Sequence, residues 1–230
     1  MTEEAKLWSK LEDWWVQRRG NCGASLAIFN TENGRLGDKK GEEIQEKELI
    51  SNIVKAIDPY ASFQEYLALA REEELAFIIS NTTEAGIEYI ESDQLSMQPP
   101  VSFPAKLTVL LYERFKHFKG AADKALTIIP CELINYNSDT LKEIILKYCA
   151  DWKLENEFVF WLTASCSFHN TLVDRIVPGY PKDQIEEYNS QLDYKDDLIV
   201  SAESFFLWVI EGDDKLKEKL PFHKTNLDVK

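Results

Sequence analysis

The apolar positions of this chain fall into short β-rich runs that alternate with longer stretches of helical period. Residues 24–30 (ASLAIFN), 75–80 (LAFIIS) and 125–130 (ALTIIP) predict buried strands, because each run is short and rich in apolar residues. Apolar residues at steps of three and four predict helices over residues 4–19, 63–71, 104–119, 139–151 and 154–165. The alternation favours an α/β fold with a parallel sheet and flanking crossover helices.

Three stretches fit this alternation less well. Residues 34–48 (GRLGDKKGEEIQEKE) are polar and dotted with glycine, so they indicate a loop, a hairpin tip or a damaged segment. Residues 196–212 (DDLIVSAESFFLWVIEG) are rich in β-branched and aromatic side chains and predict one strand or two. An apolar strand start at residues 227–229 has nothing after it, which gives the chain the look of a truncation at this end.

The charge of the chain excludes two classes of partner. Lysine and arginine number 26 against 40 aspartates and glutamates, which gives a net charge of −14. The summed field of such a chain repels nucleic acid and anionic membranes. An anionic substrate would therefore need a local basic pocket.

The cysteines and the N-terminal residues indicate a cytoplasmic protein. Cys22, Cys131, Cys149 and Cys166 are widely spaced and form no CxxC pair, so we expect buried free thiols rather than disulfides. The first residues carry acids where a signal peptide needs basic and then apolar residues. No apolar run approaches the roughly 20 residues of a membrane span.

Two polar clusters directly follow two of the predicted strands. They are SNTTEAG at residues 80–86 and PCELINYN at residues 130–137. In a doubly wound sheet both clusters would lie at the carboxyl edge, where amide and hydroxyl groups can bind a ribose or a nicotinamide amide. The alternative is that these residues only cap strands and start turns. The candidates for binding a cofactor are Asn81, Thr82, Thr83, Asn135 and Asn137.

Four charged residues are further candidates, each with a structural alternative. Glu84 could orient a ligand hydroxyl or be a solvated loop acid. Glu132 lies in an otherwise apolar turn, which favours a partly buried, perturbed carboxylate; its alternative is an ion pair with a lysine or arginine. Asp174 and Arg175 lie in the apolar run LVDRIVP, where two charges must be paired or face a cleft.

The histidines and the common nucleotide-binding and catalytic motifs do not identify a site in this sequence. His117, His169 and His223 have no metal-ligand spacing with each other or with the cysteines, so no metal site is expected. His169, beside Asn170, is the best functional candidate of the three. The chain contains no GxGxxG after a first strand, no P-loop, no GxSxG and no HExxH.

Several segments resemble one known family when they are taken together. They are ISNTTEAGI, FPAKLT with LLYERF close behind, IIPCELI, TLVDRIVPGYP and LWVIEG. In this order they are similar to the polyol-specific long-chain dehydrogenases, the mannitol dehydrogenase family, from about residue 50 to residue 229. VDRI with a following proline is shared across that family, whereas NTTEAGI and PCELI resemble its tagaturonate-reducing branch.

The resemblance implies an oxidoreductase that uses NAD to reduce the ketone of tagaturonate, a sugar acid, to altronate in hexuronate breakdown. Family members have an N-terminal Rossmann-type domain and a largely helical C-terminal domain. A lysine of that second domain, helped by asparagine and histidine, acts as general acid for the ketone and as base in the reverse direction. By this resemblance the catalytic lysine and histidine lie beyond Lys230, so this chain itself contains none of the catalytic residues.

The resemblance also assigns roles to residues within the chain. Leu133 stands where the mannitol-specific members have an asparagine that supports the transition state, which leaves that polar role open to Glu132 or Asn135. The implied cofactor-proximal cluster is Asn81, Thr82, Thr83 and Glu84, and the implied substrate-facing segment is Val173, Asp174 and Arg175. We also expect Asn135 on the cofactor side and Glu132 on the substrate side.

Residues 1–45 depart most from the family. Its members begin with a strand and a glycine-rich turn that approaches the pyrophosphate, and nothing in residues 1–45 matches that turn. We therefore expect a divergent segment over residues 1–45, with a helix and a strand, and a Rossmann-type dinucleotide-binding domain over residues 46–230. The fold would be incomplete at both ends, without the helical catalytic domain, and NAD binding weak or lost.

Other functions stay open at this point. The chain could be a noncatalytic remnant that keeps its sheet as an interaction surface. An enzyme of this family could instead act on fructuronate, mannitol or fructose, or use NADP. We also expect self-association, because the apolar residues 201–212 (SAESFFLWVIEG) would normally face the second domain.

Overall fold

A computed structural model of the chain describes residues 25–31, 44–50, 55–82, 84–196, 199–203 and 205–220. For residues 25–31, residues 44–50 and Glu84 it describes the backbone alone. The helix expected over residues 4–19 lies outside the described residues. The chain divides into two compact units, which we name the hairpin unit and the parallel-sheet unit.

The hairpin unit is built on a three-stranded sheet with the order β2-β1-β7. β1 (Ser25–Thr31) confirms the strand predicted over residues 24–30, and β2 (Ile44–Ile50) pairs antiparallel along its whole length. β7 (Val200–Ala202) pairs parallel with β1 on the other side, and α6 (Ile185–Ser190) belongs to the same unit. The loop prediction was wrong for residues 44–48, because backbone pairing with β1 outweighs the low strand propensity of the sequence IQEKE.

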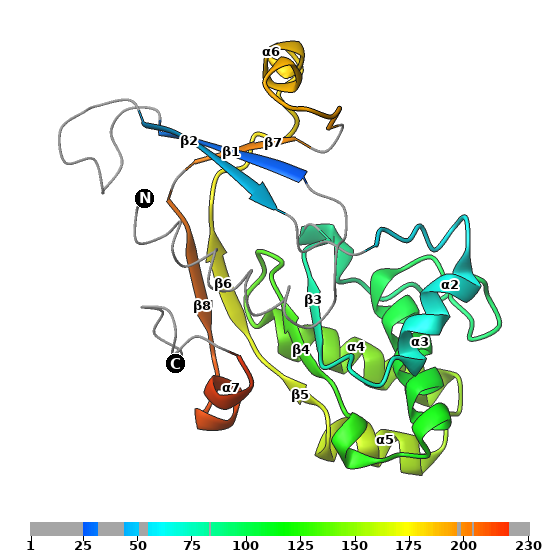
Figure 1. The fold of residues 1–230 in the computed structure, drawn as a ribbon. Coiled ribbons are helices and arrows are strands. Elements are labelled where there is room, and N and C mark those ends of the chain that lie inside the picture. Colours follow the sequence, from blue (N-terminus) through cyan, green and yellow to red (C-terminus); the bar gives the residue numbers. More distant parts are fainter. Residues whose placement is uncertain are drawn as a thin grey trace. The chain divides into compact units, whose positions relative to one another are not determined.

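The parallel-sheet unit contains the two strands that precede the polar clusters. β3 (Phe77–Ser80) and β4 (Thr127–Pro130) pair parallel from Phe77↔Thr127 to Ser80↔Pro130, and β5 (Ser167–Phe168) pairs parallel with β4 (Figure 1). A second, two-stranded sheet pairs β6 (Thr171–Asp174) with β8 (Leu207–Ile210). Residues 196–212, for which one strand or two were predicted, form two strands, β7 and β8, which belong to different sheets.

The helices of the parallel-sheet unit lie close to their predicted positions. The predicted ones are α2 (Phe63–Ala68) with the 3₁₀ turn η1 (Leu69–Arg71), α3 (Phe103–Phe118), α4 (Asn137–Asp151) and α5 (Asn156–Ala164). The structure adds the 3₁₀ turns η2 (Glu84–Gly86) and η3 (Ala122–Lys124) and, after β8, the helix α7 (Asp214–Lys219), of which the residues up to Leu216 belong to this unit. Strand and helix alternate around a parallel sheet, so the predicted α/β class is confirmed.

Helix α3 shows how the local sequence sets an element. Ser102 precedes the helix, and its hydroxyl accepts a hydrogen bond from the backbone N–H of Ala105 at 3.2 Å. Pro104 occupies the first turn, where its missing N–H is not needed. The helix ends at Lys119 in the left-handed conformation, followed by Gly120 with φ +71°. These signals fix both ends of the longest described helix.

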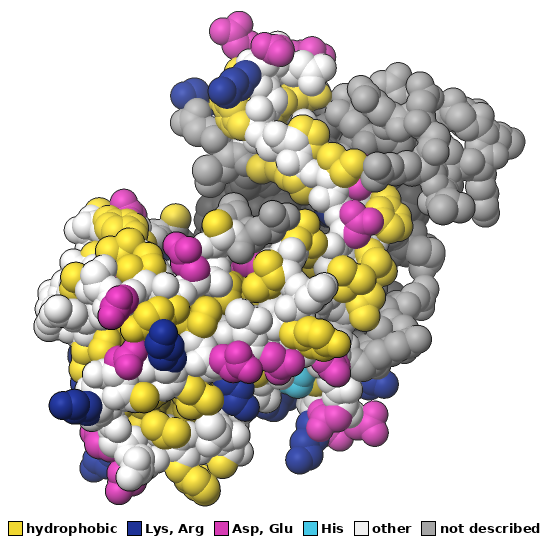
Figure 2. Space-filling view, turned by 180° about the vertical axis from the view of Figure 1, so that it is seen from behind, with side chains coloured by type: hydrophobic (Ala, Val, Ile, Leu, Met, Phe, Trp, Pro, Cys, Tyr) yellow, Lys and Arg dark blue, Asp and Glu magenta, His cyan; other side chains and the backbone are white. Residues whose placement is uncertain are grey.

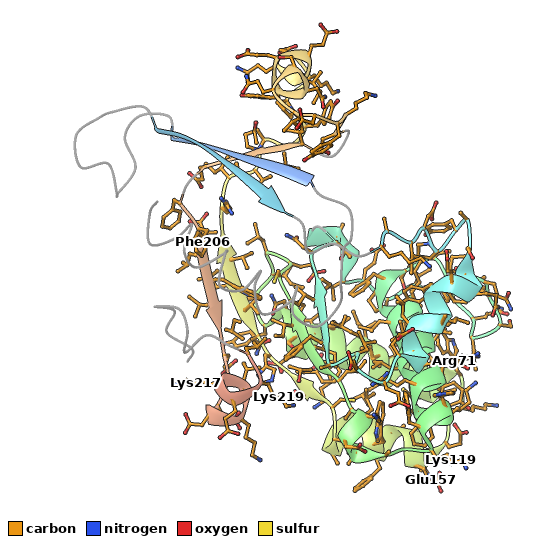
Figure 3. All side chains as sticks on the ribbon, in the orientation of Figure 1. Arg71, Lys119, Glu157, Phe206, Lys217 and Lys219 are labelled. Carbon is orange, nitrogen blue, oxygen red and sulfur yellow. The ribbon has the colours of Figure 1, made fainter. Side chains whose placement is uncertain are left out.

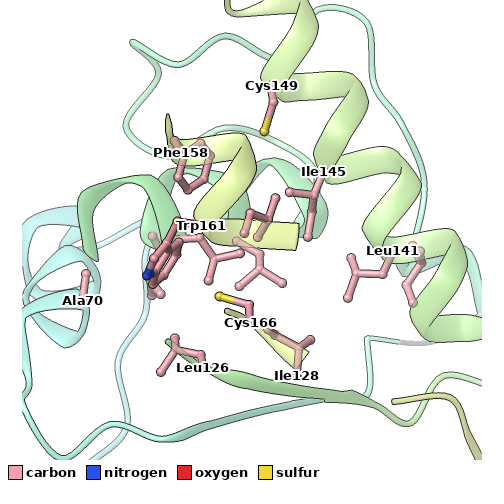
Figure 4. Packing of buried hydrophobic residues seen from close by; sticks show 14 residues of the cluster. Ala70, Leu126, Ile128, Leu141, Ile145, Cys149, Phe158, Trp161 and Cys166 are labelled. Carbon is pink, nitrogen blue, oxygen red and sulfur yellow. The ribbon is translucent and has the colours of Figure 1, made fainter. Parts of the chain in front are cut away.

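The core of the unit lies between the helices and the sheet (Figure 4). Leu107 and Leu111 of α3 pack in one cluster with Ile128 of β4, Ile145 of α4 and Phe158 of α5. All five side chains are at most 1% exposed. Burial of each such side chain contributes roughly 1.5–3 kcal/mol, so this layer holds the strand ends in fixed positions.

Arg114 of α3 organises the end of the sheet at which β3 and β4 begin. Its guanidinium is fully buried and donates to the backbone carbonyl oxygens of Ala70, Glu72, Leu75 and Lys124, at 2.6–3.0 Å. These carbonyls lie in the segments that enter the two strands. Burial lowers the pKa of the Arg114 guanidinium, and the four carbonyls supply the acceptors that a buried cation requires.

The described cysteines are buried free thiols, as expected. Cys131, Cys149 and Cys166 form no disulfide, and Cys22 lies outside the described residues. Burial raises the pKa of Cys131 to about 11 and that of Cys149 to about 12, which makes both poor nucleophiles near neutral pH. Within the described parts of the chain, no helix combines the length and apolar character that crossing a membrane requires.

Candidate functional site

The candidate site is the edge of the parallel sheet at which β3, β4 and β5 end. Residues 81–86 follow β3, residues 131–136 follow β4, and residues 169–170 follow β5. Because parallel strands end at the same edge, the structure brings the two polar clusters together, as the sequence predicts. The predicted site residues at this edge differ in burial and in hydrogen bonding.

Glu132 joins the segment after β4 to the segment after β3. Its side chain is 2% exposed. One carboxylate oxygen, Oε1, accepts from the backbone N–H and the hydroxyl of Thr82 at 2.9 and 2.8 Å, and Oε2 accepts from the Ser80 hydroxyl at 3.0 Å. Glu132 is thus fully buried rather than partly buried. The described ion pairs do not include Glu132, and neutral donors take the place of the expected cation.

Gly86 explains why the first cluster ends in glycine. A Cβ atom at this position would lie 2.0 Å from Thr82 Oγ1 and 2.5 Å from Thr82 Cβ. The absence of a side chain lets η2 fold back over Thr82 while the Thr82 hydroxyl reaches Glu132. The motifs SNTTEAG and PCEL therefore form one packed unit across 50 residues of sequence.

Asn137, at the end of the second cluster, has a structural role. Its side chain is fully buried, and the amide nitrogen donates to the backbone oxygens of Pro130 and Glu132 at 3.0 and 3.1 Å. Its oxygen accepts from the N–H groups of Ser138 and Thr171. Asn137 thus ties the end of β4 to the start of β6, which agrees with the turn-and-cap alternative for this residue.

Asn170 is an organising residue that sequence reasoning missed. Its oxygen accepts from the backbone N–H groups of Ser138 and Asp139 at 3.0 and 3.2 Å, which caps the first turn of α4. Its nitrogen donates to the carboxylates of Asp139 and Glu211 at 2.9 Å each. A cap from a residue 31–32 positions away leaves no local signal in the sequence.

The imidazole ring of His169 contacts the protein backbone. Its Nδ1 lies 2.9 Å from the backbone oxygen of Glu211. No group of three or more potential ligands that could hold a metal ion occurs among the residues that the structure describes. Its position after β5 nevertheless places it at the same edge as Glu132 and Asn137.

The groups that this edge leaves exposed are amides and apolar side chains. Asn81 and Asn135 are exposed. Leu133 is 59% exposed, and Tyr136, in the left-handed conformation with φ 53°, is 72% exposed. Amide donors beside apolar side chains suit the flat ring and carboxamide of a nicotinamide. The residues present at the edge therefore fit this group. Thr83 and the Glu84 side chain lie outside the described residues.

Asp174 and Arg175 follow Val173 at the end of β6 and belong to the hairpin unit. Asp174 is exposed. The Arg175 guanidinium donates to the backbone oxygen of Glu203 at 3.1 and 2.9 Å and lies 5.7 Å from the ring centre of Phe206, which is labelled in Figure 3. The Glu203 carboxylate in turn accepts from the Ile176 N–H. These contacts of the Arg175 guanidinium are all with residues of the hairpin unit.

This fold, with its polar strand edge, defines a Rossmann-like α/β domain. Residues 39–224 match the family described as mannitol dehydrogenase Rossmann domain, so the chain belongs to the mannitol dehydrogenase family. The family resemblance predicted from the strand-end motifs is thereby confirmed.

Within this family, the sequence is similar to altronate oxidoreductases. The chain is 48% identical over 193 residues to an altronate oxidoreductase of Yersinia enterocolitica, with 84% of this chain and 40% of that protein covered. An altronate oxidoreductase of Pectobacterium carotovorum is 50% identical over 193 residues, with the same shares covered. The chain thus spans about 40% of the length of these curated relatives.

Solved structures share the fold at lower identity. A ternary complex of Pseudomonas fluorescens mannitol 2-dehydrogenase with NAD and D-mannitol matches 83% of this chain and 38% of that chain, with a TM-score of 0.62 and 20% identity. D-sorbitol dehydrogenase in substrate-free form matches 93% of this chain and 42% of that chain, with a TM-score of 0.66 and 17% identity.

Proposed function

We propose that this chain provides the dinucleotide-binding domain of an NAD-linked oxidoreductase that interconverts tagaturonate and altronate. The observation that carries the proposal is the identity of 46–50% to altronate oxidoreductases. The Glu132 contacts support it, because they join the two motifs, NTTEAGI and PCELI, that resemble the tagaturonate-reducing branch.

In this proposal the edge after β3 and β4 receives the nicotinamide end of the cofactor. NAD, when bound, supplies or accepts the hydride of the reaction. Asn81 and Asn135 are exposed amides that would hydrogen-bond the carboxamide or a ribose hydroxyl, and Leu133 and Tyr136 would cover the ring. Thr82, Thr83 and Glu84 complete the cofactor side. Glu132 acts from beneath this surface rather than on the ligand.

Asp174 and Arg175 are proposed for the substrate side. A guanidinium fixed by a backbone carbonyl and an aromatic ring is suited to bind the carboxylate of a sugar acid. The proton transfer at the ketone is assigned to a lysine, with asparagine and histidine, of the helical domain found in this family. Those residues are proposed to lie beyond Lys230.

A chimera tests the proposed function directly. Residues 39–224 of this chain would replace the matching segment of the Yersinia enterocolitica altronate oxidoreductase. We expect the chimera to oxidise NADH with tagaturonate, and to do so faster than with fructuronate or fructose. A folded chimera that leaves tagaturonate unchanged, or that prefers another ketone, would contradict the proposal; the unmodified relative serves as the control.

The 230-residue chain by itself is proposed to bind NADH weakly. Residues 1–45 contain no sequence that matches a glycine-rich phosphate turn, and such turns place the pyrophosphate at a helix N-terminus. A fluorescence titration with NADH measures the affinity. Binding in the micromolar range would show that the chain is not impaired in this way.

A noncatalytic role is the second candidate, and the exposed apolar surface favours it. In the hairpin unit Val200, Phe205 and Leu207 are 37–39% exposed, and Figure 2 shows hydrophobic side chains exposed between acidic ones. Such a surface is proposed to support self-association. Light scattering tests the proposed self-association, and a clean monomer at all concentrations would refute it.

A further inference from the structure

Glu132 lies beneath the proposed ligand-binding edge, and among the residues that the structure describes the polar contacts of its carboxylate are with the end of β3 and the segment after it. The three donors are the Ser80 hydroxyl, the Thr82 N–H and the Thr82 hydroxyl, at 2.8–3.0 Å. At 2% exposure, the carboxylate itself has no surface to offer a substrate. Any influence of Glu132 on a ligand therefore acts through the residues that it holds, Ser80 and Thr82.

The backbone of Glu132 is fixed independently of these contacts. Asn137 donates to the Glu132 carbonyl oxygen at 3.1 Å and to the Pro130 carbonyl oxygen at 3.0 Å. Cys131, the preceding residue, donates its N–H to Ser80 O at 2.7 Å. The Glu132 carboxylate thus extends from a turn that is fixed by backbone hydrogen bonds to the segment that follows β3. This arrangement allows Glu132 to hold that segment in place.

The supported segment is held at Thr82, whose N–H and hydroxyl both donate to Glu132. The Thr82 side chain is enclosed by Gly86, where a Cβ would come within 2.0 Å of the hydroxyl, and Asn81 beside it is exposed. We propose that Glu132 is a positioning residue: its carboxylate sets the backbone of Asn81 and Thr82 in the conformation that receives the ligand. This inference rests on the proposed function for the identity of that ligand.

The two oxygens of Glu132 differ in what could replace them. Oε1 faces a backbone N–H, which can only donate, whereas Oε2 faces the Ser80 hydroxyl, which can donate or accept. In Glu132→Gln the amide oxygen takes the place of Oε1, and the amide nitrogen donates to Ser80. In Glu132→Met no acceptor is left, and the Thr82 N–H is buried without a partner. Comparison of the two variants therefore separates the effect of the lost hydrogen bonds from the effect of side-chain size.

The experiment measures two properties of the 230-residue chain and of both variants. Amide hydrogen exchange followed by NMR reports the protection of the Thr82 N–H, and titration with NADH reports ligand affinity. We expect Glu132→Met to lower the protection of Thr82 and the NADH affinity by roughly tenfold or more each. Glu132→Gln should stay within about threefold of the wild-type chain in both, since its hydrogen bonds are retained.

A matched control removes the effect of lost stability. Leu110→Ala deletes part of a buried α3 side chain in the main core, where it makes no polar contact with the edge. This variant loses stability but should bind NADH like the wild-type chain when both are measured well below their unfolding temperatures. A purely structural role for Glu132 would instead make Glu132→Met and Leu110→Ala indistinguishable in NADH affinity.

The outcomes separate this inference from the proposed function. Unchanged protection of Thr82 in Glu132→Met would overturn the inference, and so would unchanged NADH affinity in that variant. The proposed function is tested separately by the chimera, and a folded chimera that leaves tagaturonate unchanged would count against it. Hydrogen exchange at Thr82 would still decide whether Glu132 holds the segment.

Discussion

The two ends of the β3–β4 strand pair each carry a buried charged side chain, and neutral groups satisfy both. Arg114 binds four backbone carbonyls in the segments that enter the strands, whereas Glu132 binds one N–H and two hydroxyls where the strands end. The segments around Arg114 are joined to one another through its buried guanidinium. The segments around Glu132 leave the amides of Asn81 and Asn135 exposed to solvent. One sheet thus has a closed end and an end open to a ligand.

The largest effect is expected at the closed end. Arg114→Met leaves four carbonyl oxygens without their donor inside the protein, so the free energy of unfolding should fall by about 3–5 kcal/mol. Urea denaturation measures it. Arg71 is the matched control, because it is 55% exposed and forms a surface ion pair with Glu113 at 2.9 Å (Figure 3). Arg71→Met should cost less than about 1 kcal/mol; equal losses for the two arginines would contradict the role given to Arg114.

The next largest loss of stability is expected when a methyl group is added at Gly86, at the open end of the sheet. In Gly86→Ala the new methyl group collides with the Thr82 side chain, so the hydroxyl must leave Glu132, and we expect a loss of about 2–3 kcal/mol. In Gly212→Ala the nearest atom is the end of the flexible Leu216 side chain, at 2.5 Å, and the cost should be smaller. Thermal unfolding of both variants measures the difference. A larger loss at Gly212 would show that the Thr82 contact does not hold the edge.

A second buried carboxylate, that of Asp93, extends the comparison to the dependence of stability on pH. Asp93 accepts from the N–H groups of Val101 and Ser102, one on each oxygen, and from the Tyr148 hydroxyl. Burial alone would raise the pKa of Asp93, but these hydrogen bonds outweigh it and lower the pKa. Because the pKa is depressed in the folded protein, this stabilisation is present above about pH 4 and is lost as the pH falls through the folded value.

Asp93→Asn tests this sign, since an amide nitrogen must then face a backbone N–H. We expect a loss of about 1–2 kcal/mol at pH 7 and a smaller difference from the wild-type chain at pH 3. Urea denaturation at both pH values measures it. A difference that grows as the pH falls would contradict the direction of the shift. Glu132→Gln, in which the Ser80 hydroxyl can accept, should be better tolerated than Asp93→Asn at pH 7.

The smallest effect has the opposite sign. Tyr136 is held in the left-handed conformation, with φ 53°, although its side chain is 72% exposed. Asparagine tolerates this conformation, so Tyr136→Asn should stabilise the chain by about 1 kcal/mol. If Tyr136 covers a nicotinamide ring, the same variant should bind NADH less tightly. A variant that is less stable than the wild-type chain in calorimetry would show that Tyr136 packs against the protein instead.

The sequence predicts the elements better than it predicts the contacts between them. ALTIIP forms a strand that is buried on both faces, as its apolar run predicts, whereas the strand formed by LAFIIS leaves Ile79 55% exposed. The contacts of Glu132 with Thr82, and of Asn170 with the first turn of α4, join residues 50 and 31–32 positions apart, so no local pattern announces them. Strand β2 was missed because pairing with β1, rather than its polar sequence, makes it a strand.

Chemical-shift mapping of the 230-residue chain with NADH tests the contrast between the two ends most directly. The account predicts that the amide signals that move belong to the open end, at residues 80–86 and 131–136. It also predicts that residues 70–75 and 122–125, which enter the strands beside Arg114, stay in place. Shifts that concentrate beside Arg114, or that spread evenly over both ends, would contradict it.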